Sequence, residues 1–175
     1  MDGAIHLSMT REPDHRIADA VEGERHHRVL ARASDGRLIG LGSRSVYAAY
    51  FAGERCRIGY LGQLRVAPGR LHPRALREAF ARLHADRRDD ERGFDLTAIV
   101  NDNTAAVRLL ERGLPGLPRY RRLCRLQTLI AHTGRVRAAY RRDVRVAATA
   151  DLDGIVECLT AYRQARDFAC VWDRA

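Results

Sequence analysis

A short loop between an apolar strand and a helix carries the residues best suited to hold a phosphate group. The apolar run Ile58–Val66 is followed by Arg70-Leu-His-Pro-Arg-Ala75, where a stretch of helical character begins. Backbone N–H groups at a helix start attract phosphate oxygens, and arginine binds them through paired hydrogen bonds. Because Pro73 has no N–H, Arg74 and Arg77 would have to supply part of the attraction by charge. The loop therefore predicts an anion site whose affinity falls with salt.

The composition limits the kinds of protein that this chain can be. Its 175 residues suit one domain, or one domain plus a fragment of another. Its 31 cationic residues, all arginine, outnumber 22 acidic ones and give a net charge of +9. Arginine binds phosphate and carboxylate through a planar fork, which favours an anionic partner. A genomic preference for arginine codons is the better explanation of the absence of lysine.

Compartment and metal content follow from the cysteines and histidines. Four cysteines stand far apart without a CxxC pair, which is typical of reduced thiols in a cytoplasmic protein. The sequence has no secretory leader pattern and no apolar run long enough to cross a bilayer. His26-His27 is the only adjacent histidine pair, and no metal-ligand spacing accompanies it. We expect neither a membrane span nor a metal.

The first half of the chain predicts an antiparallel meander of three strands. Asp35-Gly36 and Ala52-Gly53-Glu54 are turn signals between apolar runs. Gly59 and Gly62 lie inside the third run, where glycine is typical of a bulge or of a close approach by another group. The strands are expected over residues 27–33, 37–50 and 55–66.

The second half predicts alternating helices and strands. From Ala75 the apolar residues repeat at helical spacing, and Asn103 stands where an N-cap should precede another helix. Asp151 is expected to cap a last helix with an apolar stripe. We expect strands over residues 94–100, 123–130 and 145–149, and helices over 75–87, 104–112 and 152–165.

This order of elements, with the Ile58–Val66 strand and the loop after it, resembles the GNAT superfamily of N-acetyltransferases. The resemblance implies an α/β fold: a mixed, mostly antiparallel GNAT-like sheet flanked by helices, with an appended strand-helix unit at the C-terminus. Residues 1–131 would form a GNAT-like domain without its usual opening elements. Residues 132–143 would be a linker, and 144–175 would resemble the start of a second GNAT domain, as in a piece of a tandem protein.

The resemblance also implies acetyl-CoA as acyl donor and an amine of a small molecule or peptide as acceptor. Many members place a tyrosine acid where this chain has Leu110, and often a glutamate base where it has Gln63, so the catalytic residues stay unassigned. Tyr120 could approach the place of the acid, although the habits of tyrosine favour an ordinary half-buried residue of the sheet. Glu12, Glu22 or His27 could act as base if the early segment folds over the cleft. The implied cofactor-binding residues are Leu64, Arg65, Val66, Arg70, Arg74, Ala75 and Asn103.

Two other functions stay open. The chain could be a degenerate GNAT module with a structural or binding role, because Pro73 replaces a glycine of the family's phosphate loop. The arginine-rich stretch 119–145 could contact nucleic acid, but it lacks aromatic stacking platforms and known DNA-binding spacings, so we do not favour this. For the unit from Val144 onward, we expect that strand 145–149 fills the sheet edge left open at the first strand, in a homodimer rather than within one chain.

Overall fold

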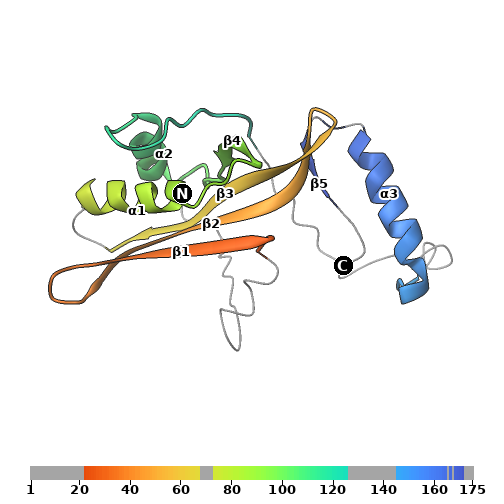
Figure 1. Cartoon of the computed structure of the whole chain (residues 1–175), viewed down its shortest axis with the longest axis horizontal. Helices are drawn as coiled ribbons and strands as arrows, with labels where there is room; N and C mark the ends of the chain where they lie inside the picture. The colour runs from red at the N-terminus through yellow and green to blue at the C-terminus, as the bar shows by residue number, and fades with distance from the viewer. Residues whose placement is uncertain (1–21, 68–72, 126–144, 165, 167, 172–175) are drawn as a thin grey trace.

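The computed structural model describes residues 22–67, 73–125, 145–164, 166 and 168–171, and these form a mixed α/β structure (Figure 1). An open, mostly antiparallel sheet of five strands is accompanied by three α-helices. The meander β1–β2–β3 is confirmed, and β4 then pairs parallel to β3. The elements are β1 (Arg25–Arg32), β2 (Leu38–Phe51), β3 (Glu54–Val66), α1 (Pro73–Ala85), β4 (Glu91–Leu96), α2 (Thr104–Glu111), a 3₁₀ turn η3 (Thr149–Asp151), α3 (Leu152–Gln164) and β5 (Phe168–Cys170).

Both predicted hairpin turns are confirmed, and both use left-handed backbone. Gly36 has a φ of 82° and its N–H donates to the Ala33 carbonyl at 2.9 Å. In the β2–β3 turn Ala52 and Gly53 have φ values of 51° and 81°. Two consecutive left-handed residues match the twist of a tight hairpin. This geometry suits Gly53 but strains Ala52, which carries a Cβ.

The helical core lies between α1, α2 and β3. Leu76 and Phe80 of α1 and Leu110 of α2 are buried together, and Leu61 and Leu64 of β3 pack against them. In Figure 1 both helices lie above the strands of the meander. The amphipathic pattern of 75–87 thus has the predicted role. Its helix begins at Pro73, where the missing N–H costs no intrahelical bond.

Strand β4 begins and ends earlier than predicted. We expected a strand over 94–100, but the strand covers Glu91–Leu96. Charged side chains can stand in this strand because their partners are buried beside them. Glu91 accepts hydrogen bonds from Arg44 of β2 and Arg25 of β1.

These residues belong to a buried ion cluster that fixes β4 against the meander. Asp95 Oδ1 accepts hydrogen bonds from Arg44 Nε at 3.1 Å and Arg44 Nη2 at 2.8 Å, and its Oδ2 accepts one from Arg87 Nη2 at 2.8 Å. Burial alone would raise the pKa of Glu91, but hydrogen bonds from Arg44, the Arg88 N–H and Arg25 outweigh it and hold that pKa below its ordinary value. We call Arg25, Arg44, Arg87, Glu91 and Asp95 the ion cluster.

The C-terminal unit differs from the prediction. Residues 145–148 form no strand and η3 follows them; the helix begins at Leu152 as expected. The cause is local, because the Asp151 carboxylate accepts bonds from the Arg145 guanidinium at 2.6 Å and the Ala148 N–H at 2.7 Å. Such bonds turn the backbone away from an extended path. Asp151 ends η3 rather than capping α3 directly.

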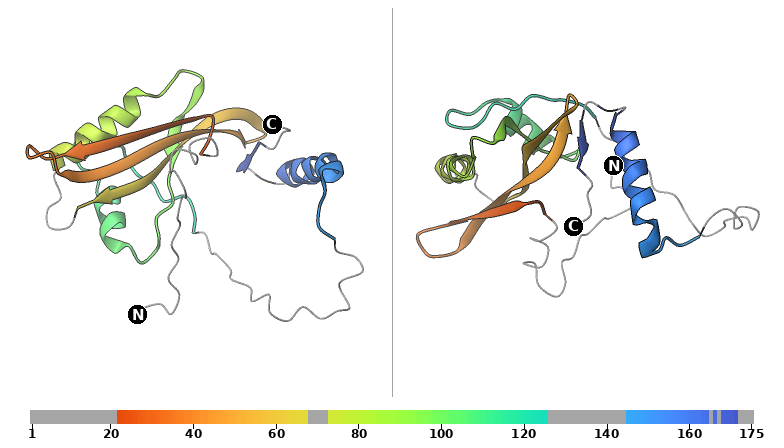
Figure 2. Two further views of the ribbon diagram at one scale, coloured as in Figure 1. Left: turned by 90° about the horizontal axis from the view of Figure 1, so that it is seen from below. Right: turned by 45° about the vertical axis from the view of Figure 1, so that its right-hand side comes forward.

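Instead of strand 145–149, β5 joins the sheet, and it does so within the same chain. Its three residues pair with Ala49–Phe51 of β2, beyond the end of β1, so they do not cover the outer edge of β1. Figures 1 and 2 place α3 beside the β2–β3 turn rather than over a face of the sheet. The Arg163 guanidinium lies 3.5 Å from the centre of the Tyr50 ring, while Leu152, Ile155 and Tyr162 are exposed.

Further predictions fall partly outside the described residues. Leu123 to Arg125 form no strand, and the rest of the expected strand 123–130 lies outside, as does the linker 132–143. All four thiols are free. No helix in the described part of the chain is long and apolar enough to span a bilayer.

Candidate functional site

The most distinctive feature of the sheet is the fork, the point after Tyr60 and Leu96 where β4 ends and β3 continues without it. Arg57↔Glu91, Gly59↔Asp95 and Tyr60↔Leu96 are the pairs that join the two strands. Beyond them, Thr97 Oγ1 donates to the Leu61 carbonyl at 2.8 Å. The rest of β3, residues 62–66, continues with no ladder partner from β4. Among the described residues no strand pairs with the second edge of this segment, so its backbone groups there could pair with a ligand.

A bulge at Gln63 lies just past the fork. Ser43 pairs with Gly62 and Leu41 with Arg65, so three steps along β3 match two along β2. Gln63 takes up the extra residue with a φ of 54°. The prediction that Gly59 and Gly62 mark a bulge or a close approach is confirmed for both. Gly62 adjoins the bulge, and a Cβ on Gly59 would lie 1.9 Å from Asp95 Oδ1.

A cavity of about 650 Å³ opens around the fork. Its walls come from β1, β2 and β3, from α1 and the start of α2, and from residues 97–100 after β4. Most lining side chains are apolar, and among the described lining residues Glu22 is the only acid and Arg65 the only cation. The volume suits a small molecule or the reactive end of a larger one.

The structure brings five of the seven implied cofactor-binding residues into this cavity, and Arg74 does not line it. Arg74 is exposed, and its Nε donates to Glu78 Oε1 at 2.8 Å. A surface pair of this kind is worth about 0–1 kcal/mol, so a phosphate could replace the glutamate. Arg70 lies outside the described residues. The five that line the cavity are Leu64, Arg65, Val66, Ala75 and Asn103.

Leu64 and Asn103 both use polar groups in contacts within the chain, which limits what they offer a ligand. The Leu64 side chain belongs to the helical core, and its carbonyl accepts a bond from Arg65 Nη1 at 3.0 Å. A ligand N–H at this carbonyl would compete with that arginine. The Asn103 Oδ1 accepts the Ala106 N–H at 3.2 Å, so the predicted N-cap is confirmed.

Tyr120 lines the same cavity, although it does not lie on a strand as the sequence favoured. Its ring packs edge-on against Phe80, with ring centres 6.4 Å apart. Burial, followed by the negative charge of Asp95, raises the pKa of its phenol to about 12. The hydroxyl therefore stays protonated at neutral pH, where it can donate a hydrogen bond, and it is a weaker acid than an ordinary tyrosine.

A polar cluster faces the cavity beside Gln63. The sequence indicated only one of its members, Glu22, as a candidate base. Gln63 Nε2 donates to both carboxylate oxygens of Glu22 at 3.2 Å, and His26 Nε2 lies 3.1 Å from Glu22 Oε2. The last distance is that of an ion pair, although the angle is poor for a hydrogen bond. His26 Nδ1 lies 2.7 Å from Ser45 Oγ. Only the position of Glu22 shortly before β1 hinted at this arrangement.

Of the other two candidate bases, one lies away from the cavity and one is outside the described residues. His27 Nδ1 lies 3.5 Å from Asp86 Oδ2, and His27 does not line the cavity. Glu12 falls outside the described residues. Within the described part of the chain no three His, Cys, Asp or Glu side chains are grouped to hold a metal ion. Of the two candidate bases that the structure describes, Glu22 lines the cavity and His27 does not.

Comparisons with known proteins add no relative. The chain matches no protein-family model, no curated protein sequence and no solved structure. The case for function therefore depends on the geometry of the fork.

Proposed function

We propose that the chain is an N-acetyltransferase of the GNAT type, which uses acetyl-CoA to acetylate an amine of a small molecule or peptide. The observation that carries the proposal is the fork, where residues 62–66 run along a cavity with one backbone edge open. The pantetheine arm of coenzyme A is peptide-like and can pair with such an edge. The GNAT resemblance of the sequence implies that the pantetheine arm lies along Leu64–Val66.

The charges around the cavity suit the remainder of the coenzyme. Arg65 lines the cavity, and Arg74 stands in the first turn of α1 with only an exposed glutamate as partner. We expect Arg74, with Arg70, to contact the phosphates. Because Pro73 removes a backbone donor from this turn, binding would depend on charge and weaken with salt.

We assign the role of the acid to Tyr120 because it lines the cavity. Amine attack on the thioester expels a thiolate, which must take up a proton. A neutral phenol that lines the same cavity as Asn103 can give that proton. Tyr120 thus replaces the tyrosine that the family often has at the position of Leu110, which is buried in the helical core.

Calorimetric titration with acetyl-CoA in a series of salt concentrations tests the proposal. We expect binding that weakens with salt, a loss of affinity in Arg74→Ala, and tighter binding in Pro73→Gly. Arg82→Ala, on the same helix but outside the cavity lining, is the control. Tyr120→Phe should bind normally and acetylate more slowly, by a factor of about 100. No binding even at low salt would disprove the proposal.

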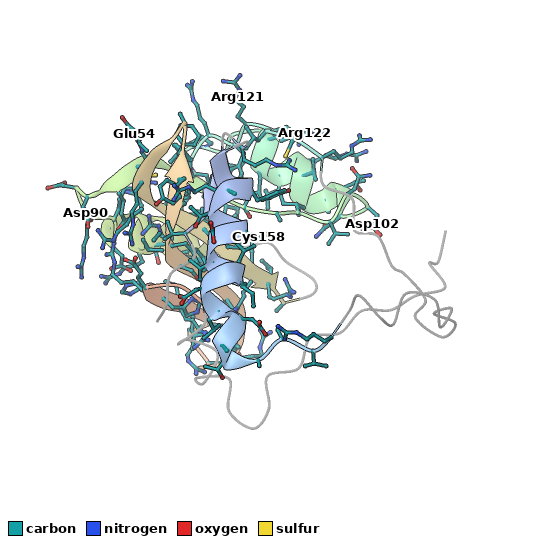
Figure 3. All side chains as sticks on the ribbon, turned by 90° about the vertical axis from the view of Figure 1, so that its right-hand side faces the viewer. Glu54, Asp90, Asp102, Arg121, Arg122 and Cys158 are labelled. Atoms are coloured by element: carbon teal, nitrogen blue, oxygen red, sulfur yellow. The ribbon has the colours of Figure 1, made fainter. Side chains whose placement is uncertain are left out.

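The second candidate is a degenerate GNAT module that binds without catalysis. The occupied Leu64 carbonyl and the paired Arg74 favour it, because both are engaged within the chain. Binding of acetyl-CoA without turnover of any amine would support it. For nucleic acid, Figure 3 shows Arg121 and Arg122 at the top of the view, between Glu54 on the left and Asp102 on the right. A basic surface alone gives weak support.

A further inference from the structure

A row of three polar side chains crosses the sheet from β1 to β3. His26 pairs with Ser45, and Ser45 pairs with Tyr60, so the three residues stand side by side on one face of the sheet. His26 Nδ1 lies 2.7 Å from Ser45 Oγ, and His26 Nε2 lies 3.1 Å from Glu22 Oε2. A serine hydroxyl, an imidazole and a carboxylate thus form a continuous chain of contacts.

The carboxylate decides which nitrogen of the His26 ring carries the proton. A carboxylate offers only acceptors, so the imidazole proton is favoured on Nε2, the nitrogen that faces Glu22. Nδ1 is then the bare nitrogen, and the Ser45 hydroxyl donates to it. Gln63 Nε2 donates to both oxygens of Glu22 at 3.2 Å, which holds the carboxylate in place. An imidazole oriented in this way by a third group can take a proton from a serine.

The serine is shielded from bulk water but borders the cavity at the fork. Ser45 is 3% exposed and the His26 side chain is 2% exposed, and in so poorly solvated a place hydrogen bonds and charges act strongly. Ser45 and Tyr60 both line the cavity. The Tyr60 ring leans along β3 toward Gly62, where a Cβ would lie 3.2 Å from its Cε1, and so away from the row. A small acyl group in the cavity can therefore approach the Ser45 hydroxyl.

The neighbouring Ser43 differs from Ser45 in one respect. Ser43 is also 3% exposed, lines the same cavity and lies two positions earlier on β2, so it faces the same side of the sheet. Its partner on β1 is Arg28, which has no imidazole. Of these two serines, Ser45 is the one with a base beside it.

We propose that Ser45 is a nucleophile and His26 its general base, and that the chain hydrolyses small uncharged esters or thioesters. Glu22 is a positioning residue, which acts through His26 by orienting the ring and stabilising the imidazolium that forms. The contacts of Glu22 with Gln63 and His26 serve this role. The activity is separate from the proposed acetyl transfer to an amine and goes beyond it, because the acyl group passes to water and an ester substrate needs no coenzyme.

The proton and bond balance is complete with these groups and one water molecule. Ser45 Oγ attacks the acyl carbonyl carbon while His26 Nδ1 takes the hydroxyl proton, and a tetrahedral intermediate forms. The bond from that carbon to the leaving oxygen or sulfur breaks, and His26 gives the proton to the leaving alcohol or thiol. His26 next takes a proton from water as the water attacks the acyl-serine. The carboxylic acid leaves, and the proton returns to Ser45 Oγ.

Release of p-nitrophenol from p-nitrophenyl acetate by the full chain measures the activity. Ser45→Ala should lower kcat at least about 100-fold, whereas the matched control Ser43→Ala should keep it. Phenylmethylsulfonyl fluoride should add covalently to Ser45 in the unmodified chain, as located by mass spectrometry of its peptides, so the test does not depend on the folding of a variant. Hydrolysis no faster than in buffer, equal rates in the two alanine variants, or a label found elsewhere than on Ser45 would overturn the assignment.

The role of Glu22 has its own test. Glu22→Gln should lower kcat for p-nitrophenyl acetate at least about 10-fold with little change in KM, because the carboxylate acts on the imidazolium of the transition state. Glu22→Asp should recover part of kcat. Glu24→Gln is the matched control, since Glu24 lies two residues away and pairs with exposed Arg57 at 2.7 Å. Equal kcat in the two glutamine variants would remove Glu22 from the proposal.

Acetyl-CoA without any amine distinguishes the source of the acyl group and separates this inference from the proposed function. Release of free thiol that Ser45→Ala abolishes assigns a coenzyme thioester, and ester hydrolysis without thiol release assigns an ester. Ester hydrolysis that depends on Ser45 supports the inference even if acetyl-CoA fails to bind and the transferase proposal falls. A chain that acetylates an amine but neither hydrolyses the ester nor takes the label on Ser45 overturns this inference alone.

Discussion

Substitution of Gly59 by alanine should destabilise the protein strongly, because the ion cluster fills the space beside it. A Cβ at Gly59 would lie 1.9 Å from Asp95 Oδ1, 2.5 Å from Arg44 Nη2 and 2.9 Å from Arg44 Cζ. The Arg44 side chain is fully buried and bonded to both Glu91 and Asp95, so it cannot swing into solvent. The substitution must separate a buried ion pair or displace β3.

The expected cost follows from these two routes. Overpacking of a core costs about 1–3 kcal/mol, and breaking a buried ion pair costs about 3–5 kcal/mol. We expect a loss of about 3 kcal/mol in the free energy of unfolding. For a chain of this size that corresponds to a fall in Tm of roughly 6–12 °C. Urea and thermal unfolding followed by circular dichroism measure both quantities.

Gly93→Ala is the matched control, on the strand that contributes Asp95. No heavy atom lies within 4 Å of a Cβ built at Gly93, and its φ is not in the left-handed region. The substitution should be neutral or stabilising by about 0.5 kcal/mol. Equal stability of the two alanine variants would refute the steric argument. In an Asp95→Ala background the cost of Gly59→Ala should shrink by at least about 1 kcal/mol, because the closest contact is gone.

Two further predictions concern stability. The folded pKa of Glu91 lies below its ordinary value of 4.5, so ionised Glu91 stabilises the fold above that pH, and this contribution is lost as the pH falls through the folded pKa. In urea unfolding measured from pH 6 to pH 3, the free energy of unfolding should fall more steeply in the unmodified chain than in Glu91→Gln. Ala52→Asn should stabilise the chain by roughly 1 kcal/mol, because asparagine tolerates the φ of 51° at the β2–β3 turn; an unchanged Tm would contradict this.

The parts of the fold that depend on local pattern could be predicted from sequence. The Asp35-Gly36 turn and the Asn103 N-cap each depend on residues within four positions, and both are present. The position of β4 could not be predicted, because Glu91 and Asp95 look like solvent-exposed charges until Arg44, some 50 residues earlier, is seen beside them.

The candidate site divides in the same way. Leu64, Arg65 and Val66 were implied by the GNAT resemblance, and they line the cavity. The Glu22 cluster joins a residue before β1 to one in the β3 bulge, and no spacing in the sequence encodes that contact. The strand expected at 145–149 failed because an aspartate side chain competed with backbone pairing.

The extra residue in β3 has a consequence for insertions and deletions. Without the bulge, Leu61 and Leu64 would point to opposite faces of the sheet; with it, both pack on the helical core, and Gln63 reaches Glu22. Removing any one residue from 62–64 would therefore reverse the facing of every later residue in the strand. The β1–β2 turn carries no such constraint. Deletion of a whole residue should therefore be tolerated in the β1–β2 turn but should disrupt the fold at the bulge. Natural variants of different length would then differ at sites away from the fork.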